Sequence, residues 1–180
     1  MNQIIFATLA LALATMMSFG QTKSIRHSRE RLLDDEVEVM ASGVALQVIE
    51  HVGSKRFDAA VGDGSVPVTS ATALQATFPS GNRCDVTLPI QTTSPYANCD
   101  DVEDFHGMAW EELPFVAGAD TVRFEVSAHV NYVDAATQDT TTTRTFHKRV
   151  TVLVRSKADA GGRTMLRMPV RLPRVYSYPD

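Results

Sequence analysis

The chain has 180 residues, enough for one domain with a substantial core and an additional segment. Its net charge is −4, from 17 basic and 21 acidic residues, so the bulk charge does not indicate a nucleic-acid-binding surface. Hydrophobic residues make up 44% of the chain, as in ordinary globular proteins, and there are only two cysteines.

The first predicted element is the apolar segment IIFATLALALATMMSF, residues 4–19, which contains no charged residue. One interpretation is a signal peptide cleaved at Gly20, because Ser18 and Gly20 supply the small residues that a signal peptidase reads. The other is a retained membrane anchor over residues 1–22, since a straight span needs about 20 apolar residues. The basic residues that follow would favour a cytoplasmic head by the positive-inside rule, which conflicts with export. Both interpretations stay open.

A long amphipathic helix is predicted next, over residues 23–58. No proline interrupts it, and apolar residues recur at every third or fourth position, which is typical of one buried stripe on an α-helix. The residues expected to pack on the following domain are Val44, Val48, Val52 and Phe57. No clear stop signal separates this helix from the apolar segment, so the two can form one continuous helix.

The two cysteines, Cys84 and Cys99, flank a segment rich in proline and threonine. After export they would be in an oxidising compartment, where a disulfide between them could form. Such a bridge would be worth about 3 kcal/mol in the chain-entropy model. We expect it if the chain is exported; the alternative is two unrelated thiols.

Four carboxylates follow the second cysteine, at Asp100, Asp101, Glu103 and Asp104. Oxygen ligands at this density suit Ca²⁺, so calcium is the one cofactor that the sequence suggests. The spacing is not that of an EF-hand loop, and no glycine lies within the run. The alternative is a solvated acidic turn in which one carboxylate caps a short helix.

The head domain, residues 59–180, is predicted to form an antiparallel β-sheet. Apolar and polar residues alternate over 122–132, 146–155 and 164–172, and the third strand is expected at an edge because Pro169 cannot donate to a ladder. The apolar face of this sheet must be covered, and the amphipathic helix is the obvious cover. The predicted fold class is α+β: a long N-terminal helix, with a membrane part and an amphipathic part, packed on an antiparallel β-sheet head.

This organisation resembles the type IV pilin and type II secretion pseudopilin superfamily over the whole chain. The stretch ASGVALQVIEHVGSKRFDAA, residues 41–60, is similar to the end of the long helix in many pseudopilin-like proteins. The stretch CDDVEDFHGM, residues 99–108, is similar to the acidic segment of some minor pilin-like proteins. The N-terminus departs from the family pattern, because it has no Phe-Thr-Leu-Ile-Glu motif and no glutamate before Glu30.

The resemblance implies a non-enzymatic, divergent minor subunit of a type IV pilus or a type II secretion-like filament. Its partners would be other pilin-like subunits, contacted through the N-terminal helix, and the bacterial inner membrane, with the head in the periplasm or outside the cell. The alternative is a secreted or periplasmic β-rich binding module, for calcium or another ligand, released by cleavage at Gly20. An enzyme is not expected, because the sequence has no Ser-His-Asp spacing, no glycine-rich phosphate loop and no Cys-x-x-Cys.

Overall fold

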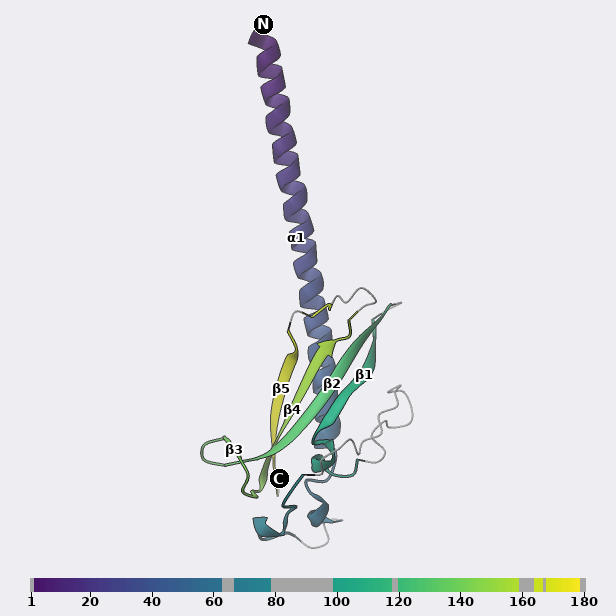
Figure 1. Ribbon diagram of the computed structural model, residues 1–180, viewed down its shortest axis with the longest axis vertical. Coiled ribbons are helices and arrows are strands. Elements are labelled where there is room, and N and C mark those ends of the chain that lie inside the picture. The colour runs from purple at the N-terminus through teal and green to yellow at the C-terminus, as the bar shows by residue number, and fades with distance from the viewer. Residues whose placement is uncertain are drawn as a thin grey trace. The chain divides into compact units, whose positions relative to one another are not determined.

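The computed structural model describes residues 2–62, 67–78, 99–117, 120–158, 164–166 and 168–178. Its elements in chain order are α1 (Asn2–Gly53), the 3₁₀ turns η1 (Ala59–Val61), η2 (Ala71–Ala73) and η3 (Val102–Phe105), and the strands β1 (Met108–Ala117), β2 (Asp120–Val133), β3 (Thr140–Thr141), β4 (His147–Ser156) and β5 (Val170–Ser177). The fold is α+β, with one N-terminal helix and one antiparallel sheet of five strands (Figure 1).

The sheet has the strand order β1-β2-β4-β5, and the short β3 pairs with the end of β2. All neighbouring strands run antiparallel. In the centre of the sheet, Val126 lies opposite Val154 and Val130 lies opposite Val150, and all four are fully buried. Because side chains alternate between the faces of a strand, these valines mark the face that carries the core.

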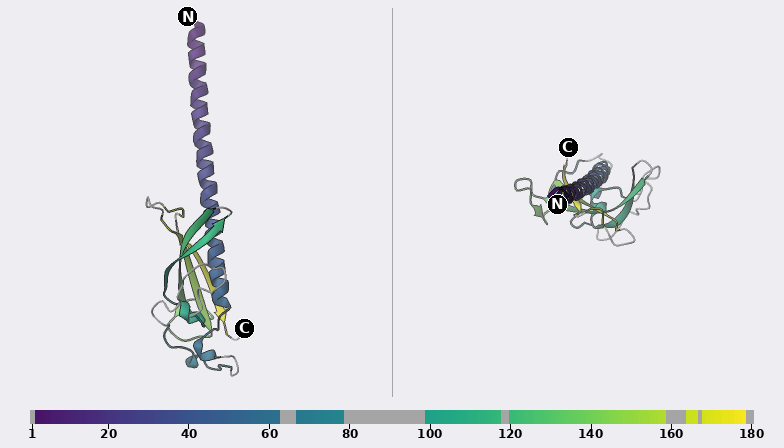
Figure 2. Two further views of the ribbon diagram at one scale, coloured as in Figure 1. Left: turned by 90° about the vertical axis from the view of Figure 1, so that its right-hand side faces the viewer. Right: turned by 90° about the horizontal axis from the view of Figure 1, so that it is seen from above.

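The chain falls into two compact units, Met1–Val37 and Glu38–Asp180. Within the second unit, the last turns of α1 lie along the sheet (Figure 2). Their buried residues recur at every third or fourth position: Ala41, Val44, Ala45, Val48, Ile49 and Val52. Phe57, which follows the helix, is 9% exposed. The four residues that were expected to pack on the head are therefore all buried.

Helix α1 ends at Gly53, before the predicted boundary at residue 58. The amides of Ser54 and Lys55 still donate to helix carbonyl groups. The backbone of Arg56 then pairs in parallel with the segment around Asp101, so it leaves the helical path. Tertiary pairing with the acidic segment thus ends the helix earlier than the local sequence predicts.

Helix α1 runs without a break through Gly20, so the backbone itself gives no boundary between residues 1–22 and 23–58. The division between compact units lies instead between Val37 and Glu38. Across the residues described in the structure, no helix is long and apolar enough to span a membrane.

Strand β1 is an element that the sequence analysis did not predict. Its pairing with β2 is shifted between Met108 and Glu111, and Pro114 lies within the strand. A bulge puts two consecutive residues opposite one, so it interrupts the period of two by which strands are recognised. Both features are tolerated because β1 lies at an edge of the sheet.

Strand β5 covers Val170–Ser177, whereas the alternation predicts a strand over 164–172. Of the apolar residues in register with Val170, Leu166 is buried but Met168 is exposed. The alternation before residue 170 therefore does not mark a continuous buried face. The edge position predicted for this strand is confirmed, and its internal proline is Pro173.

Candidate functional site

The core contains a lysine side chain with no exposed surface. Lys148 on β4 is 0% exposed, and its ammonium group has three acceptors. They are the carbonyl oxygen of Phe57 at 2.6 Å, Oδ2 of Asp58 at 2.7 Å and Oε2 of Glu103 at 2.8 Å. Both carboxylates are buried as well. The hydroxyl of Tyr132 also donates to Asp58. We call Lys148, Asp58, Glu103 and Tyr132 the Lys148 cluster.

Three separate parts of the chain position the charged groups of this cluster. The alternation of β4 places Lys148 on the same face as the buried valines of that strand. Asp58 caps η1, since its Oδ1 accepts the N–H of Ala60 at 3.0 Å. Glu103 lies on η3, and its Oε1 accepts the N–H of Ala59 at 2.7 Å. The cluster therefore joins the segment after α1, the turn η3 and the sheet.

Donors hold both oxygens of the Asp58 carboxylate in place. Besides Ala60, the N–H of Gln75 lies 3.3 Å from each oxygen. The hydroxyl of Tyr132 lies 3.2 Å from Oδ2 and 2.9 Å from the carbonyl oxygen of Gln75, so one proton serves two acceptors. Oδ1 thus faces two backbone N–H groups, whereas Oδ2 faces Lys148, the hydroxyl and the N–H of Gln75 that both oxygens share.

Aromatic rings surround the Lys148 ammonium group. The ring centroids of Phe57, Tyr132 and Phe78 lie 4.5, 5.5 and 5.8 Å from Nζ. Burial raises the pKa of the Tyr132 hydroxyl, and the neighbouring Asp58 carboxylate raises it further. The cluster therefore holds one cation and two carboxylates in a water-poor, low-dielectric environment.

The structure does not gather the acidic run into the cation site predicted for Asp100, Asp101, Glu103 and Asp104. Glu103 faces Lys148, and Asp104 accepts the N–H groups of Asp100 and Asp101 at 3.0 and 3.2 Å. In the described ranges, no three His, Cys, Asp or Glu side chains are grouped so as to hold a metal ion. The geometry differs from the prediction because capping of η3 and pairing with Lys148 direct the carboxylates apart.

Asp101 is buried, and its Oδ1 lies 3.0 Å from Nε of Arg56. The pKa of its carboxyl group is raised to about 6: burial is the largest cause, the Glu103 carboxylate acts in the same direction, and Arg56 opposes both. Because the ordinary value is 3.8, the folded protein holds this proton more tightly than the unfolded chain does. The associated stability is present below about pH 4 and is lost as the pH rises through about 6.

The variant Asp101→Asn is expected to remove this dependence, because an amide does not ionise. Between pH 4 and pH 7, the wild-type protein should lose stability relative to Asp101→Asn. Urea unfolding at each pH unit measures the difference. Asp100→Asn, at an exposed neighbouring carboxylate, is the matched control and should run parallel to the wild type. Parallel curves for Asp101→Asn would contradict the assignment.

Cys99 is fully buried and disulfide-bonded. Cys84 is the other cysteine of the sequence and lies outside the described residues. Their pairing therefore stays a prediction.

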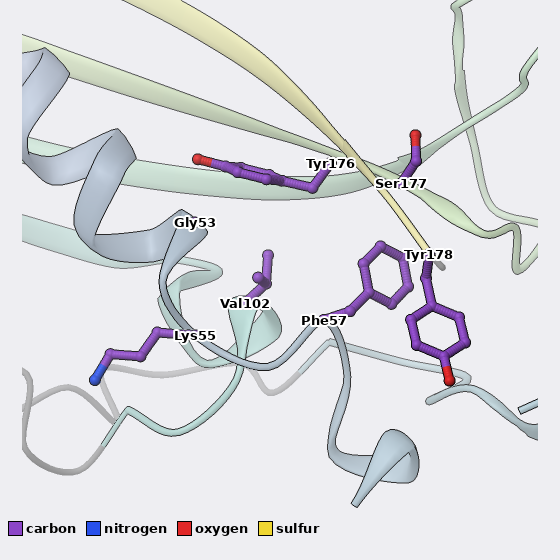
Figure 3. Close-up of a pocket in the computed structure, with 7 residues that line it drawn as sticks. All are labelled: Gly53, Lys55, Phe57, Val102, Tyr176, Ser177 and Tyr178. Carbon is purple, nitrogen blue, oxygen red and sulfur yellow. The ribbon is translucent and has the colours of Figure 1, made fainter. Parts of the chain in front are cut away.

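A pocket of about 180 Å³ lies between the end of α1 and the end of β5 (Figure 3). Its lining residues are Gly53, Lys55, Phe57, Val102, Tyr176, Ser177 and Tyr178. The rings of Phe57 and Tyr178 are stacked, with centroids 5.7 Å apart. A Cβ atom at Gly53 would lie 2.7 Å from Cε1 of Tyr176, so glycine gives this ring room. Phe57 thus lines the pocket and also contacts the Lys148 ammonium group through its ring.

Comparisons with protein-family models, with curated proteins and with solved structures find no match to this chain. A function therefore has to be inferred from the residues of the chain itself.

The sequence analysis did not recognise the Lys148 cluster. One signal was present, because Lys148 occupies an apolar-face position of an alternating strand, beside Phe146 and Val150. Its partners Asp58 and Glu103 are 90 and 45 residues away, so periodicity alone does not identify them.

Proposed function

We propose that this protein is a non-enzymatic assembly subunit, a pilin-like protein whose helix α1 packs against α1 of further copies in a filament. The observation that carries the proposal is apolar surface on α1 that the head domain does not cover. The sequence resemblance to pilins and pseudopilins points in the same direction.

Among the α1 side chains that the structure describes, five of the eight exposed large apolar residues are separated by multiples of seven, and Met16, Met17 and Leu33 lie outside this repeat. The heptad stripe, as we call it, consists of Leu11, Ile25, Leu32, Val39 and Leu46. Their exposed fractions run from 48% to 71%, and Ser18 occupies the remaining position of the repeat. A repeat of seven keeps residues close to one face of a helix, and it is the pattern by which helices pack on one another. We propose this row of exposed apolar side chains as the surface through which α1 packs on α1 of another copy.

Within the second unit, an exposed apolar residue and a buried one lie on opposite sides of α1. Residues nine apart point in opposite directions, because an α-helix has 3.6 residues per turn. Val39 and Val48 are such a pair, and the first is exposed while the second is buried. The exposed apolar residue Val39 therefore lies on a side of α1 that the head does not use.

The proposed location is outside the cytoplasm, with the head in the periplasm or at the cell surface and the N-terminal part of α1 in the inner membrane or in a filament. The disulfide-bonded state of Cys99 supports export, because disulfides persist mainly in oxidising compartments. The unbroken helix through Gly20 supports retention of the N-terminal segment.

Substitution in the heptad stripe tests the proposal. The full chain is purified in mild detergent, and its assembly on detergent dilution is followed by sedimentation velocity over a concentration series. Leu32→Lys should weaken assembly about tenfold or more, since burying one leucine is worth about 1.5–3 kcal/mol and about 1.4 kcal/mol is a factor of ten.

Leu33→Lys is the matched control, because it makes the same change at the next residue, which is equally exposed but about 100° away around the helix. It should assemble like the wild type. A wild-type chain that stays monomeric at every concentration would overturn the proposal. Equal loss in both variants would overturn the role of the heptad stripe.

A second candidate is a secreted or periplasmic binding module, and the observation that favours it is the pocket beside Phe57. Its aromatic walls suit a small planar or apolar group. If this candidate holds, the mature protein begins after Gly20 and is recovered in soluble form. Mass spectrometry of the mature N-terminus separates the two candidates, because the assembly subunit should keep residues 1–20.

A further inference from the structure

We propose that Lys148 and Asp58 become joined by an intramolecular amide bond between Nζ and Cγ, so that the Lys148 cluster is a covalent modification site. Condensation of an amine with a carboxyl group needs an amine beside the carboxyl carbon, a carrier for protons, donors for the charge that develops on oxygen, and exclusion of water. The cluster contains each of these four elements.

The amine and the carboxyl group are already in contact. Nζ of Lys148 lies 2.7 Å from Oδ2 of Asp58, and neither side chain has exposed surface. Reaction requires a shift of Nζ from this oxygen to the carbon of the same carboxyl group. Because the fold already holds the amine beside the carboxyl group, the reaction does not have to meet the entropy cost of bringing two separate molecules together. That cost is a large part of the barrier to such a reaction in solution.

Glu103 is placed to carry the protons. Its Oε2 lies 2.8 Å from Nζ, and its other oxygen is fixed by the N–H of Ala59. A carboxylate in direct contact with the ammonium group can take a proton from it and return that proton to a leaving oxygen.

Asp58 is the carboxyl group with donors for the developing charge. The N–H groups of Ala60 and Gln75 lie 3.0 and 3.3 Å from Oδ1. Backbone donors fixed in this way stabilise the negative charge of a tetrahedral intermediate. Among the residues that the structure describes, Glu103 has a single backbone donor, the N–H of Ala59. This difference assigns Asp58 as the electrophile and Glu103 as the proton carrier.

The step is balanced without any further reactant. Glu103 takes one proton from the Lys148 ammonium group and passes it to Oδ2, so that the neutral amine adds its electron pair to Cγ of a protonated Asp58 carboxyl group. A second proton then moves from Nζ through Glu103 to Oδ2. The C–O bond then breaks, and Oδ2 leaves with its electron pair as water. The products are a neutral amide and an ionised Glu103, so the cluster has the same net charge before and after.

The surroundings favour the product over the ion pair. Two buried charges of opposite sign carry a desolvation cost that a neutral amide does not. The rings of Phe57, Phe78 and Tyr132 surround Nζ, so water has little access to reverse the step.

Peptide mapping of the reduced full chain tests the proposal directly. Trypsin separates Asp58 in residues 57–83 from Glu103 in residues 84–123, and an amide on Lys148 blocks cleavage after it. We expect a branched peptide of residues 57–83 and 145–149 whose mass is lower than the sum of the two by one water. Recovery of linear peptides alone would overturn the proposal, and a branch to residues 84–123 would overturn the choice of Asp58.

Two variants complete the experiment. Lys148→Arg keeps the positive charge but should give no branched peptide. Glu103→Gln keeps the shape of the side chain and should slow formation of the bond about 10²–10⁴-fold, the usual effect of losing a general acid–base group. An undiminished rate in Glu103→Gln would overturn its role as the proton carrier. If a variant fails to fold, the peptide map of the wild type still decides the proposal, and it does so independently of filament assembly.

Discussion

Replacing Lys148 with methionine is expected to lower the free energy of unfolding by about 3–5 kcal/mol, because it leaves two buried carboxylates without their cation. Asp58 and Glu103 lie 2.7 and 2.8 Å from Nζ and are fully buried. Methionine fills a similar volume, so packing is largely kept while the charge is removed. Urea unfolding of the head measures the effect, and the covalent bond proposed above would add to the loss.

Lys157→Met is the matched control, because it makes the same change at an exposed lysine that is also ion-paired. Lys157 contacts Glu112 on the surface of the sheet. Exposed ion pairs are worth about 0–1 kcal/mol, so this variant should unfold like the wild type. A similar small loss in Lys148→Met would contradict the assignment of the cluster as a stabilising link.

Neutralising the two buried carboxylates that Lys148→Met leaves without a cation should restore part of the free energy of unfolding. In the triple variant Lys148→Met, Asp58→Asn, Glu103→Gln, the polar side chains keep some hydrogen bonds to Ala59 and Ala60 but no longer carry buried charge. We expect it to be more stable than Lys148→Met alone, since replacing a whole buried ionic group is far less costly than breaking it.

The spacing of apolar residues along the sequence correctly predicted those elements that bury a single face, namely the last turns of α1 and strands β2 and β4. The stripe that includes Val44, Val48 and Val52 is buried, and the alternating segments 122–132 and 146–155 correspond to β2 and β4. Strand β1 was missed because its bulge and Pro114 break the alternation at the edge of the sheet.

Features that depend on distant partners could not be predicted in the same way. The end of α1 is set by pairing of Arg56 with Asp101, which is a tertiary contact. Glu103 belongs by sequence to an acidic run, but its position is decided by Lys148 on β4. A cluster of like residues in sequence therefore suggested one ligand set, whereas the fold gives its members different partners.

The apolar residues of α1 illustrate the same limit. A helix with a wide apolar stripe predicts burial, yet the pattern does not say which residues the chain itself will cover. The structure separates them, because Val48 is buried in the head and Val39 is exposed. Residues left exposed with a spacing of seven are those for which a partner helix has to be proposed.

Phe57→Ala is expected to lower the free energy of unfolding by about 3–5 kcal/mol, the usual cost of removing a buried phenylalanine ring. The ring stacks on Tyr178 and lies under the Lys148 ammonium group. Its loss would open the pocket toward the cluster and loosen the segment that joins α1 to η1. Hydrogen exchange should therefore accelerate over residues 54–61 and in β5.

Two comparisons determine whether the position of the ring is what matters. Phe57→Leu keeps most of the apolar volume but no ring, and should cost less than about 1.5 kcal/mol. Phe115→Ala removes a half-buried ring on β1, far along the sheet order from β5, and should leave exchange in β5 unchanged. If Phe57→Ala destabilised the protein no more than Phe115→Ala, Phe57 would not be the residue that fixes the end of α1 against the sheet.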